Sequence, residues 1–273
     1  MTHSNASFTG SIPEHYDQNL GPLFFEPYAK DLAKRLRLGR AAAVLEIAAG
    51  TGIVTAHLRD RLSPDARLVV TDLNPAMLDV ARQKIPADDR LEWRPADAGA
   101  LPFADGSFDA VVCQFGLMFF PDRPAALREI RRVLKPSGTV LFNVWGSLDD
   151  NPIGLAAHQV VLSFFLTDPP MFFTVPWGLH DEQLIRQLLK NAGYAHVASD
   201  TVDLVGTSES AEAAAKGLIL GTPIFTAIQD RGTVDPVVIT HALAARLASE
   251  GGSAPMQLPM RALVFTAIRN EPS

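Results

Sequence analysis

Short apolar runs alternate with amphipathic stretches along the first half of the chain. Runs typical of buried strands cover 42–48, 67–71, 90–94, 108–114 and 139–144. Helical periodicity lies between them, at 53–61, 75–84 and 123–134. Buried strands that alternate with helices indicate right-handed βαβ units and a parallel sheet covered on both faces. The pattern therefore predicts an α/β fold.

The pattern changes outside this region. Residues 1–20 are polar, and a helical pattern follows over 22–38. Residues 147–179 contain no Lys or Arg but hold several aromatic residues and four prolines. A helix is then predicted over 181–191, with Asp181 as its N-cap. Strands predicted at 195–205 and 260–269 flank an Ala-rich, mostly helical segment at 208–250, and they would complete a seven-stranded sheet.

Composition limits the class of protein. The chain has 273 residues, of which 47% are hydrophobic and 20% charged, as in globular proteins. No apolar run approaches the ~20 residues that span a bilayer, and the first fifteen residues lack the features of a secretion signal. The lone Cys113 argues against a disulfide framework and a multi-cysteine zinc site, so no metal is expected. These features predict a cytoplasmic protein without a membrane span.

The charge argues against nucleic acid as a partner. The formal net charge is −6, whereas nucleic-acid binding depends on Lys and Arg that neutralise phosphates. The densest basic groups, at 34–37 and 128–135, are interpreted as solvated faces of amphipathic helices. We therefore expect a small-molecule partner.

The turn after the first predicted strand carries the clearest sign of a ligand. Gly50-Thr51-Gly52 joins this strand to a helix, and glycines let the backbone turn sharply beside a nucleotide. Asp72 follows about twenty residues on, where a carboxylate can accept hydrogen bonds from ribose hydroxyls. Thr55 stands where a dinucleotide fingerprint has its third glycine. Glu46 suits a ligand with an ammonium group better than a pyrophosphate. S-adenosylmethionine (SAM) fits better than NAD, although an NAD-dependent oxidoreductase remains an alternative.

Four ordered motifs resemble those of a known family. They are Glu46-Ile47-Ala48-Ala49-Gly50-Thr51-Gly52, the segment 71–78, the pair of segments 96–98 and 101–112, and 134–138. Over residues 40–145 the chain resembles the class I SAM-dependent methyltransferases of methyltransferase type 11, similar to the ubiquinone/menaquinone C-methyltransferases and related small-molecule enzymes. It departs from their first motif where Ala48 replaces a glycine. The resemblance implies a Rossmann-like, seven-stranded, mostly parallel sheet with helices on both faces and a helical, aromatic lid.

The resemblance also implies which residues hold SAM. The methionine part would lie against the turn, with Glu46 on its ammonium group. Gln114 would lie below the sulfonium, and Asp72 would bind the ribose. An N-terminal segment would close over the cofactor. The implied cofactor set is Tyr16, Tyr28, Glu46, Ala48, Gly50, Thr51, Gly52, Asp72, Leu73, Met77, Asp97, Ala98, Gln114 and Phe115.

Methyl transfer from a sulfonium is an in-line displacement that gains mainly from proximity and orientation. A general base is required only where the acceptor must lose a proton. The sequence shows no obvious base. His158 and His180, in or beside the aromatic-rich segment, are candidates, and each has an alternative as a helix-face or capping residue.

The aromatic-rich segment is the expected substrate lid. We expect 147–179 to cover the acceptor pocket, and its lack of Lys and Arg favours a planar or hydrophobic acceptor. The expected division is a lid segment and helix at 1–38, a SAM-binding core at 39–146, the lid insert at 147–179, and the rest of the core at 180–273 with a helical insert at about 208–250. The rings expected to line the acceptor pocket are Phe164, Phe165, Phe172, Phe173 and Trp177.

These observations predict a SAM-dependent methyltransferase that acts on a small molecule and releases S-adenosylhomocysteine. The alternative is a non-catalytic SAM-binding or regulatory protein of the same fold. The acceptor, the methylated atom (O, N or C) and the oligomeric state stay open.

Overall fold

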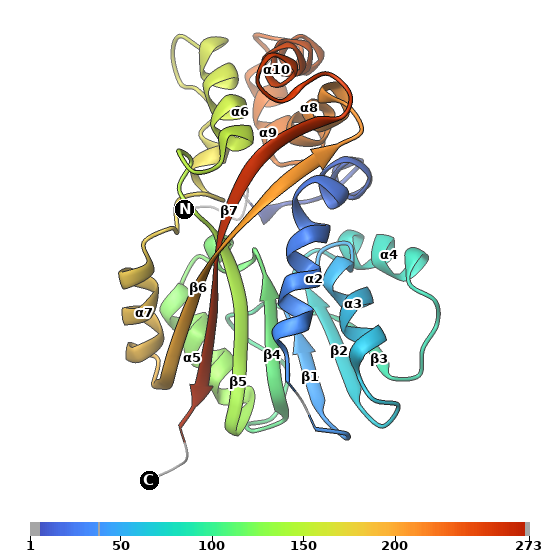
Figure 1. Ribbon diagram of the computed structural model, residues 1–273, viewed down its shortest axis with the longest axis vertical. Helices are drawn as coiled ribbons and strands as arrows, with labels where there is room; N and C mark the ends of the chain where they lie inside the picture. Colours follow the sequence, from blue (N-terminus) through green and yellow to red (C-terminus); the bar gives the residue numbers. More distant parts are fainter. Residues whose placement is uncertain (1–5, 38, 271–273) are drawn as a thin grey trace.

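The computed structural model describes residues 6–37 and 39–270 and contains one seven-stranded sheet (Figure 1). The strand order is β3-β2-β1-β4-β5-β7-β6. The first five strands are parallel, and β7 runs antiparallel to both β5 and β6. The predicted seven-stranded, mostly parallel sheet is confirmed. The strands are β1 (Ala43–Glu46), β2 (Arg67–Asp72), β3 (Leu91–Pro95), β4 (Phe108–Gln114), β5 (Leu134–Trp145), β6 (Tyr194–Ser208) and β7 (Met256–Arg269).

Helices cover both faces of this sheet because the central strands bury side chains on both sides. In β2, Leu68 and Val70 pack with the layer of α2, α3 and α4, whereas Val69 packs with the opposite layer, which contains α5 and α7. This alternation follows from the two-residue repeat of a strand. The helices are α2 (Glu26–Arg35), α3 (Ile53–Arg61), α4 (Pro75–Lys84), α5 (Arg123–Val133) and α7 (Glu182–Asn191).

A helical cap lies beyond the carboxyl ends of the parallel strands (Figure 1). The long antiparallel strands β6 and β7 extend from the sheet into this cap, where α10 packs on α8 and α6. Three helices occupy the segment that the sequence marked as mostly helical. The cap consists of α6 (Pro152–Ser163), α8 (Ala211–Leu220), α9 (Ile224–Arg231) and α10 (Pro236–Gly251).

The N-terminal segment is helical earlier than expected. A short α1 (Ile12–His15) leads into a π-helix, η2 (Tyr16–Phe25), which continues into α2. The predicted helix over 22–38 therefore begins about ten residues too late, because the apolar side of η2 is buried against tertiary partners. A Cβ at Gly217 of α8 would lie 2.6 Å from Leu20 Cδ2, so a glycine is needed for this close approach. Residues 1–5 of the expected lid segment lie outside the described residues.

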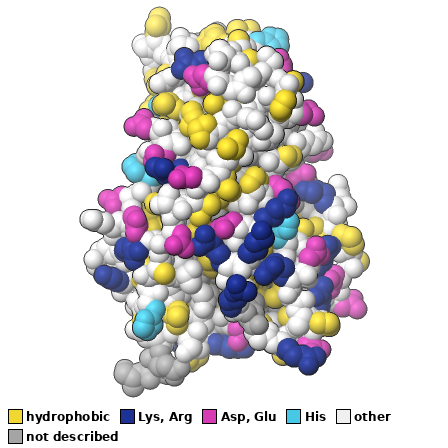
Figure 2. Space-filling model, viewed as in Figure 1, with side chains coloured by type: hydrophobic (Ala, Val, Ile, Leu, Met, Phe, Trp, Pro, Cys, Tyr) yellow, Lys and Arg dark blue, Asp and Glu magenta, His cyan; other side chains and the backbone are white. Residues whose placement is uncertain are grey.

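Some residues of the basic groups noted in the sequence form ion pairs on the surface. Figure 2 shows Lys and Arg side chains over the sheet and α2, with acidic side chains among them, and a less charged cap. Arg35 contacts Asp31 and Asp200, while Arg132 contacts Glu129 and Asp105. Among residues 6–37 and 39–270, no single helix is long and apolar enough to cross a membrane, and one pair, α8 with α9, meets the criterion only jointly, with a 70° bend.

Candidate functional site

A cavity of about 460 Å³ opens at the carboxyl ends of the parallel strands. Its wall comes from the N-terminal segment, the loops after β1 to β4, the start of α5 and the insert that precedes α7. This is the edge at which open α/β sheets bind ligands. The lining residues are Ala6, Phe8, Tyr16, Ile47, Ala48, Gly50, Asp72, Leu73, Asn74, Met77, Ala96, Asp97, Ala98, Gln114, Phe115, Gly116, Met118, Phe119, Phe120, Pro121, Arg123, Thr174, Val175 and Gly178.

The turn after β1 has two glycines with different surroundings. Gly50 lines the cavity with φ +57°, and a Cβ there would make ordinary contact with Met77 at 3.6 Å. Gly52 adopts φ +80°, and a Cβ there would lie 2.8 Å from both Ala81 Cβ and Ile85 Cδ1. Gly50 therefore keeps space for a ligand, whereas Gly52 permits α3 to approach α4.

Ala48 lies in the same turn, where the family pattern has a glycine. Its φ is +52°, a left-handed conformation that costs roughly 1–2 kcal/mol for a residue with a Cβ. Its backbone lines the cavity nonetheless. The replacement of glycine is thus tolerated at a cost in local strain.

Asp72 ends β2 with its carboxylate on the cavity wall. The side chain is 7% exposed, and it accepts hydrogen bonds from the backbone amides of Gly50 and Asn74, both at 2.8 Å. Burial raises the pKa of this carboxyl, and the amide hydrogen bonds act in the opposite direction. A carboxylate has about four lone-pair sites. Asn74 Nδ2 also donates to Oδ1 at 3.4 Å, so one site, on Oδ2, remains for a hydroxyl group of a ligand in the cavity.

One end of the cavity offers a flat, partly apolar slot. Leu73 remains 47% exposed beside the wall, and Met77 is buried beneath it. Asp97 and Ala98, from the loop after β3, complete this end. Asp97 Oδ1 accepts the Gly99 amide at 2.8 Å, which orients the carboxylate. These groups can enclose a planar base and accept a hydrogen bond from its amino group.

Gln114 and Phe115 form the floor after β4. Gln114 Nε2 donates to the Phe25 carbonyl at 2.8 Å, while its Oε1 is buried without a partner. Phe115 has φ +49° and stacks on Trp145 at 3.8 Å between ring centroids. A bulky residue in this conformation is uncommon and persists where its surroundings hold it in place. Both residues line the cavity.

The N-terminal segment closes one side of the cavity. Tyr16 stacks on Phe25 at 4.8 Å, and Phe8 meets Tyr16 edge-on at 5.5 Å. Asn74 holds this segment, because its Nδ2 donates to the Ala6 carbonyl at 3.0 Å and its Oδ1 accepts the Phe8 amide at 3.3 Å. Burial and the nearby Asp72 raise the pKa of Tyr16. The sequence analysis assigned neither Asn74 nor Phe8 to the site, and the only signal for Phe8 was an aromatic residue in a polar stretch.

Known proteins match this arrangement. A family model described as "Methyltransferase domain" matches residues 45–142. The ubiquinone/menaquinone biosynthesis C-methyltransferase of Idiomarina loihiensis is 33% identical over 177 residues, 58% of this chain and 68% of the relative. The chain belongs to the class I SAM-dependent methyltransferases.

Other relatives agree with this membership. The corresponding enzyme of Hahella chejuensis is 41% identical over 122 residues, 44% of this chain and 49% of the relative. The demethylmenaquinone methyltransferase of Lactobacillus johnsonii is 37% identical over 139 residues, 49% of this chain and 57% of the relative. The chain thus spans about half the length of these two relatives. A Haemonchus contortus phosphoethanolamine N-methyltransferase 2 in complex with SAM shares the fold, with TM-score 0.61, 16% identity, and coverage of 98% of this chain and 59% of that chain.

SAM is the cofactor of this methyltransferase family, and the cavity residues fit it. Asp72 presents a carboxylate on the cavity wall that suits a ribose, and Gln114 lines the same cavity. The slot at Leu73, Asp97 and Ala98 suits the adenine. Of the fourteen residues that the resemblance assigned to SAM, ten line the cavity, namely Tyr16, Ala48, Gly50, Asp72, Leu73, Met77, Asp97, Ala98, Gln114 and Phe115.

Four residues of that set lie off the wall in this methyltransferase. Tyr28 is fully buried in the core, where its hydroxyl donates to the Val202 carbonyl at 3.2 Å. Thr51 is 1% exposed and, like Gly52, is enclosed behind the turn. Tyr28 was expected to contact the cofactor, but the helical N-terminal segment turns Tyr16, and not Tyr28, toward the cavity.

Glu46, the fourth, lies beneath the turn. Its Oε2 accepts the Thr55 hydroxyl at 2.7 Å, and burial raises the pKa of its carboxyl to about 8. Thr55 is the residue that distinguished the turn from a dinucleotide fingerprint. The structure thus pairs both residues across the start of α3, where a carboxyl group also complements the helix dipole.

The insert approaches the cavity with different residues from those expected. Phe165, Phe172, Phe173 and Trp177 are buried in the core, and the half-buried Phe164 packs against it. The wall is formed instead by Thr174, Val175 and Gly178. The rings turn inward because the cap needs an apolar core of its own. Trp177, for example, packs so tightly on α6 that a Cβ at Gly154 would lie 2.5 Å from its ring.

Two further aromatic residues of the cavity wall come from the loop after β4. Phe119 and Phe120 line the cavity, and Phe119 stacks on Phe172 of the insert at 6.4 Å between centroids. Sequence analysis missed both rings, because it assigned acceptor contacts to the insert alone. The apolar run after the cofactor motif, 115–120, was the available signal.

The candidate histidines lie outside the cavity wall. His158 is half-buried on α6, and burial lowers its pKa. His180 is exposed, with Nδ1 2.9 Å from the Trp177 carbonyl. The described residues also contain no group of three or more His, Cys, Asp or Glu that could hold a metal ion.

Proposed function

We propose that this chain transfers the methyl group of SAM to a small, planar, largely apolar molecule. The observation that supports this most is the continuity of one cavity from Asp72 and Asp97 to the rings of Phe119 and Phe120. The first end suits an adenosyl group and the second an aromatic acceptor. Small-molecule sites commonly combine such apolar walls with a few placed polar groups.

The residues of this chain would mainly bind the cofactor and the acceptor and orient them toward one another. SAM supplies a methyl group already activated by its sulfonium. Asp72 and Gly50 would hold the cofactor at the strand ends, and Phe119 with Val175 would hold the acceptor opposite. Phe8 and Tyr16 cover this space from the N-terminal side and exclude water. Orientation of this kind accelerates a displacement without further chemistry from the protein.

The cavity favours an acceptor that needs no protein base. Among the described residues, its titratable wall groups are Tyr16, Asp72, Asp97 and Arg123. The two aspartates lie at the cofactor end, and the raised pKa of Tyr16 keeps its hydroxyl protonated. We infer that the acceptor is nucleophilic as it binds, as an electron-rich ring carbon or an ionised heteroatom is. The names of the first relatives, which are C-methyltransferases, favour carbon.

The test is transfer of a trideuterated methyl group from labelled SAM to a panel of electron-rich aromatic molecules, followed by mass spectrometry of acceptor and S-adenosylhomocysteine. A labelled acceptor formed with equimolar S-adenosylhomocysteine supports the proposal. Tight S-adenosylhomocysteine binding without transfer to any acceptor would instead favour the non-catalytic SAM-binding alternative. The fold does not decide between them, because a [4+2]-cyclase, SpnF, shares it with TM-score 0.58 and 20% identity.

A further inference from the structure

Arg123, the first residue of α5, is a cation on the acceptor side of the cavity without an acidic partner. Its Nη2 donates to the Met118 carbonyl at 3.0 Å, and its Nε is buried without any partner. Among residues 6–37 and 39–270, no carboxylate forms an ion pair with it. The neighbouring carboxylate of Asp122 is engaged, since it accepts the Ala125 amide at 2.8 Å as the N-cap of α5.

Most of the other partly buried arginines among the described residues meet a carboxylate, whereas Arg131 and Arg269 donate to backbone carbonyls. Arg132 meets Glu129 and Asp105, and Arg261 meets Asp150 and Asp203. Burial alone lowers the pKa of Arg123, which means that no nearby acid opposes the desolvation. A guanidinium stays charged in proteins. The site therefore carries an uncompensated positive charge.

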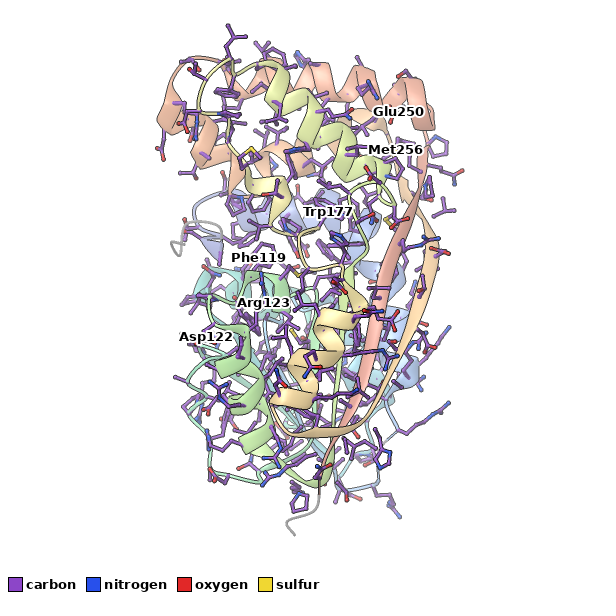
Figure 3. All side chains as sticks on the ribbon, turned by 90° about the vertical axis from the view of Figure 1, so that its left-hand side faces the viewer. Phe119, Asp122, Arg123, Trp177, Glu250 and Met256 are labelled. Atoms are coloured by element: carbon purple, nitrogen blue, oxygen red, sulfur yellow. The ribbon has the colours of Figure 1, made fainter. Side chains whose placement is uncertain are left out.

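The surroundings make this charge costly. The wall residues that precede Arg123 are Met118, Phe119, Phe120 and Pro121, all without charge. A cation in the first turn of a helix also opposes the helix dipole. In Figure 3, Arg123 lies beside Phe119 between the sheet and the cap, whereas Asp122 lies farther out. A half-buried guanidinium that lines an apolar wall and has no acidic partner offers the charge that an anionic ligand group requires.

We propose that Arg123 binds a carboxylate of the methyl acceptor, so that the substrates are planar aromatic carboxylic acids. The inference rests on the proposed function and names its substrate class. One guanidinium balances one carboxylate and matches it with two parallel hydrogen bonds. A phosphate dianion would keep an unbalanced charge among Phe119 and Phe120, because no Lys or second Arg lines the described wall.

Matched pairs of probes test this, namely benzoate with benzamide, 2-naphthoate with 2-naphthamide, and 2-anthracenecarboxylate with its amide. Calorimetry on the S-adenosylhomocysteine-saturated protein should show at least one carboxylate bound tenfold or more tightly than its amide. Arg123→Gln should abolish this preference, and Arg123→Lys should retain part of it. Arg128→Gln is the matched control, because it removes the same charge from an exposed position of α5 and should leave the preference intact.

S-adenosylhomocysteine titrations separate this inference from the proposed function. We expect Arg123→Gln and Arg128→Gln to bind S-adenosylhomocysteine within threefold of the original chain. Equal affinities within every probe pair, or no binding of any carboxylate, would overturn the assignment of Arg123 but not the methyltransferase. A large loss of S-adenosylhomocysteine affinity in Arg123→Gln would also overturn it, since the guanidinium would then serve the cofactor. Failure of the original chain to bind S-adenosylhomocysteine would contradict the proposed function itself.

Discussion

The backbone amide of Gly50 donates a 2.8 Å hydrogen bond to Asp72 Oδ2, which ties the turn after β1 to the end of β2. Asp72 therefore does two things at once. It lines the cavity, where we propose that it binds the ribose of SAM, and it holds the turn that would surround the methionine part of the cofactor. Changes at either residue should affect cofactor binding before they affect the rest of the fold.

Asp72→Ala should weaken S-adenosylhomocysteine binding by about 1–3 kcal/mol, because charge-assisted hydrogen bonds to the ribose and to Gly50 are lost. Calorimetry measures the loss. Asp79→Ala is the control, since Asp79 is exposed on the following helix and only meets Arg82 at 3.4 Å. Equal affinities of the two variants would contradict the assignment of Asp72.

Gly50→Val and Gly52→Val should fail in different ways. Gly50→Val should lose cofactor binding while it stays folded, because its Cβ meets only Met77 at 3.6 Å and the branched side chain projects at the ligand site. Gly52→Val should lower the melting temperature strongly, since its Cβ would clash with Ala81 and Ile85. Thermal unfolding and calorimetry on both variants check this. A Gly50→Val protein that binds S-adenosylhomocysteine normally would show that the turn is not the cofactor site.

Phe119→Ala and Phe173→Ala should separate acceptor binding from stability. Phe119 lines the cavity, so its truncation should raise KM for the acceptor and leave S-adenosylhomocysteine affinity nearly unchanged. Phe173 is 1% exposed, and its truncation should cost about 3–5 kcal/mol of stability through the cavity it leaves. Steady-state kinetics and urea unfolding distinguish the two. If Phe173→Ala instead raised KM and Phe119→Ala instead lowered stability, the acceptor would be bound by the buried rings of the insert.

Glu46→Gln should change how stability depends on pH. The Glu46 carboxyl has a pKa of about 8 in the folded chain against an ordinary value of 4.5, so the folded state holds a proton that the unfolded state releases. Its contribution to stability is complete below about pH 4.5 and is lost as the pH rises to about 8. Urea unfolding at pH 5, 6, 7 and 8 should therefore show a smaller decline for Glu46→Gln than for the original chain. The exposed Glu14→Gln is the control, and parallel curves for all three would contradict the shifted pKa.

The local sequence pattern was enough to predict the strands of the sheet and the residues that follow their carboxyl ends. The strand predicted at 108–114 and the helix predicted at 75–84 coincide with β4 and α4. They were predictable because a buried strand or a helix start depends on residues that are close together in the sequence. Gly50, Asp72 and Asp97 meet at one edge for a similar reason. Each ends a parallel strand or follows one directly, and parallel strands deliver their carboxyl ends to the same side.

Tertiary structure decided which aromatic residues line the cavity. Phe172 and Phe119 stack on one another, yet only Phe119 reaches the cavity, because the cap buries the rings of its own insert. Arg123 and Phe8 join the same wall from segments that no local pattern connects. Which face of a ring or a guanidinium is left uncovered depends on how the cap packs on the sheet. That packing is a sum over contacts between residues far apart in the chain, and no short stretch of sequence contains it.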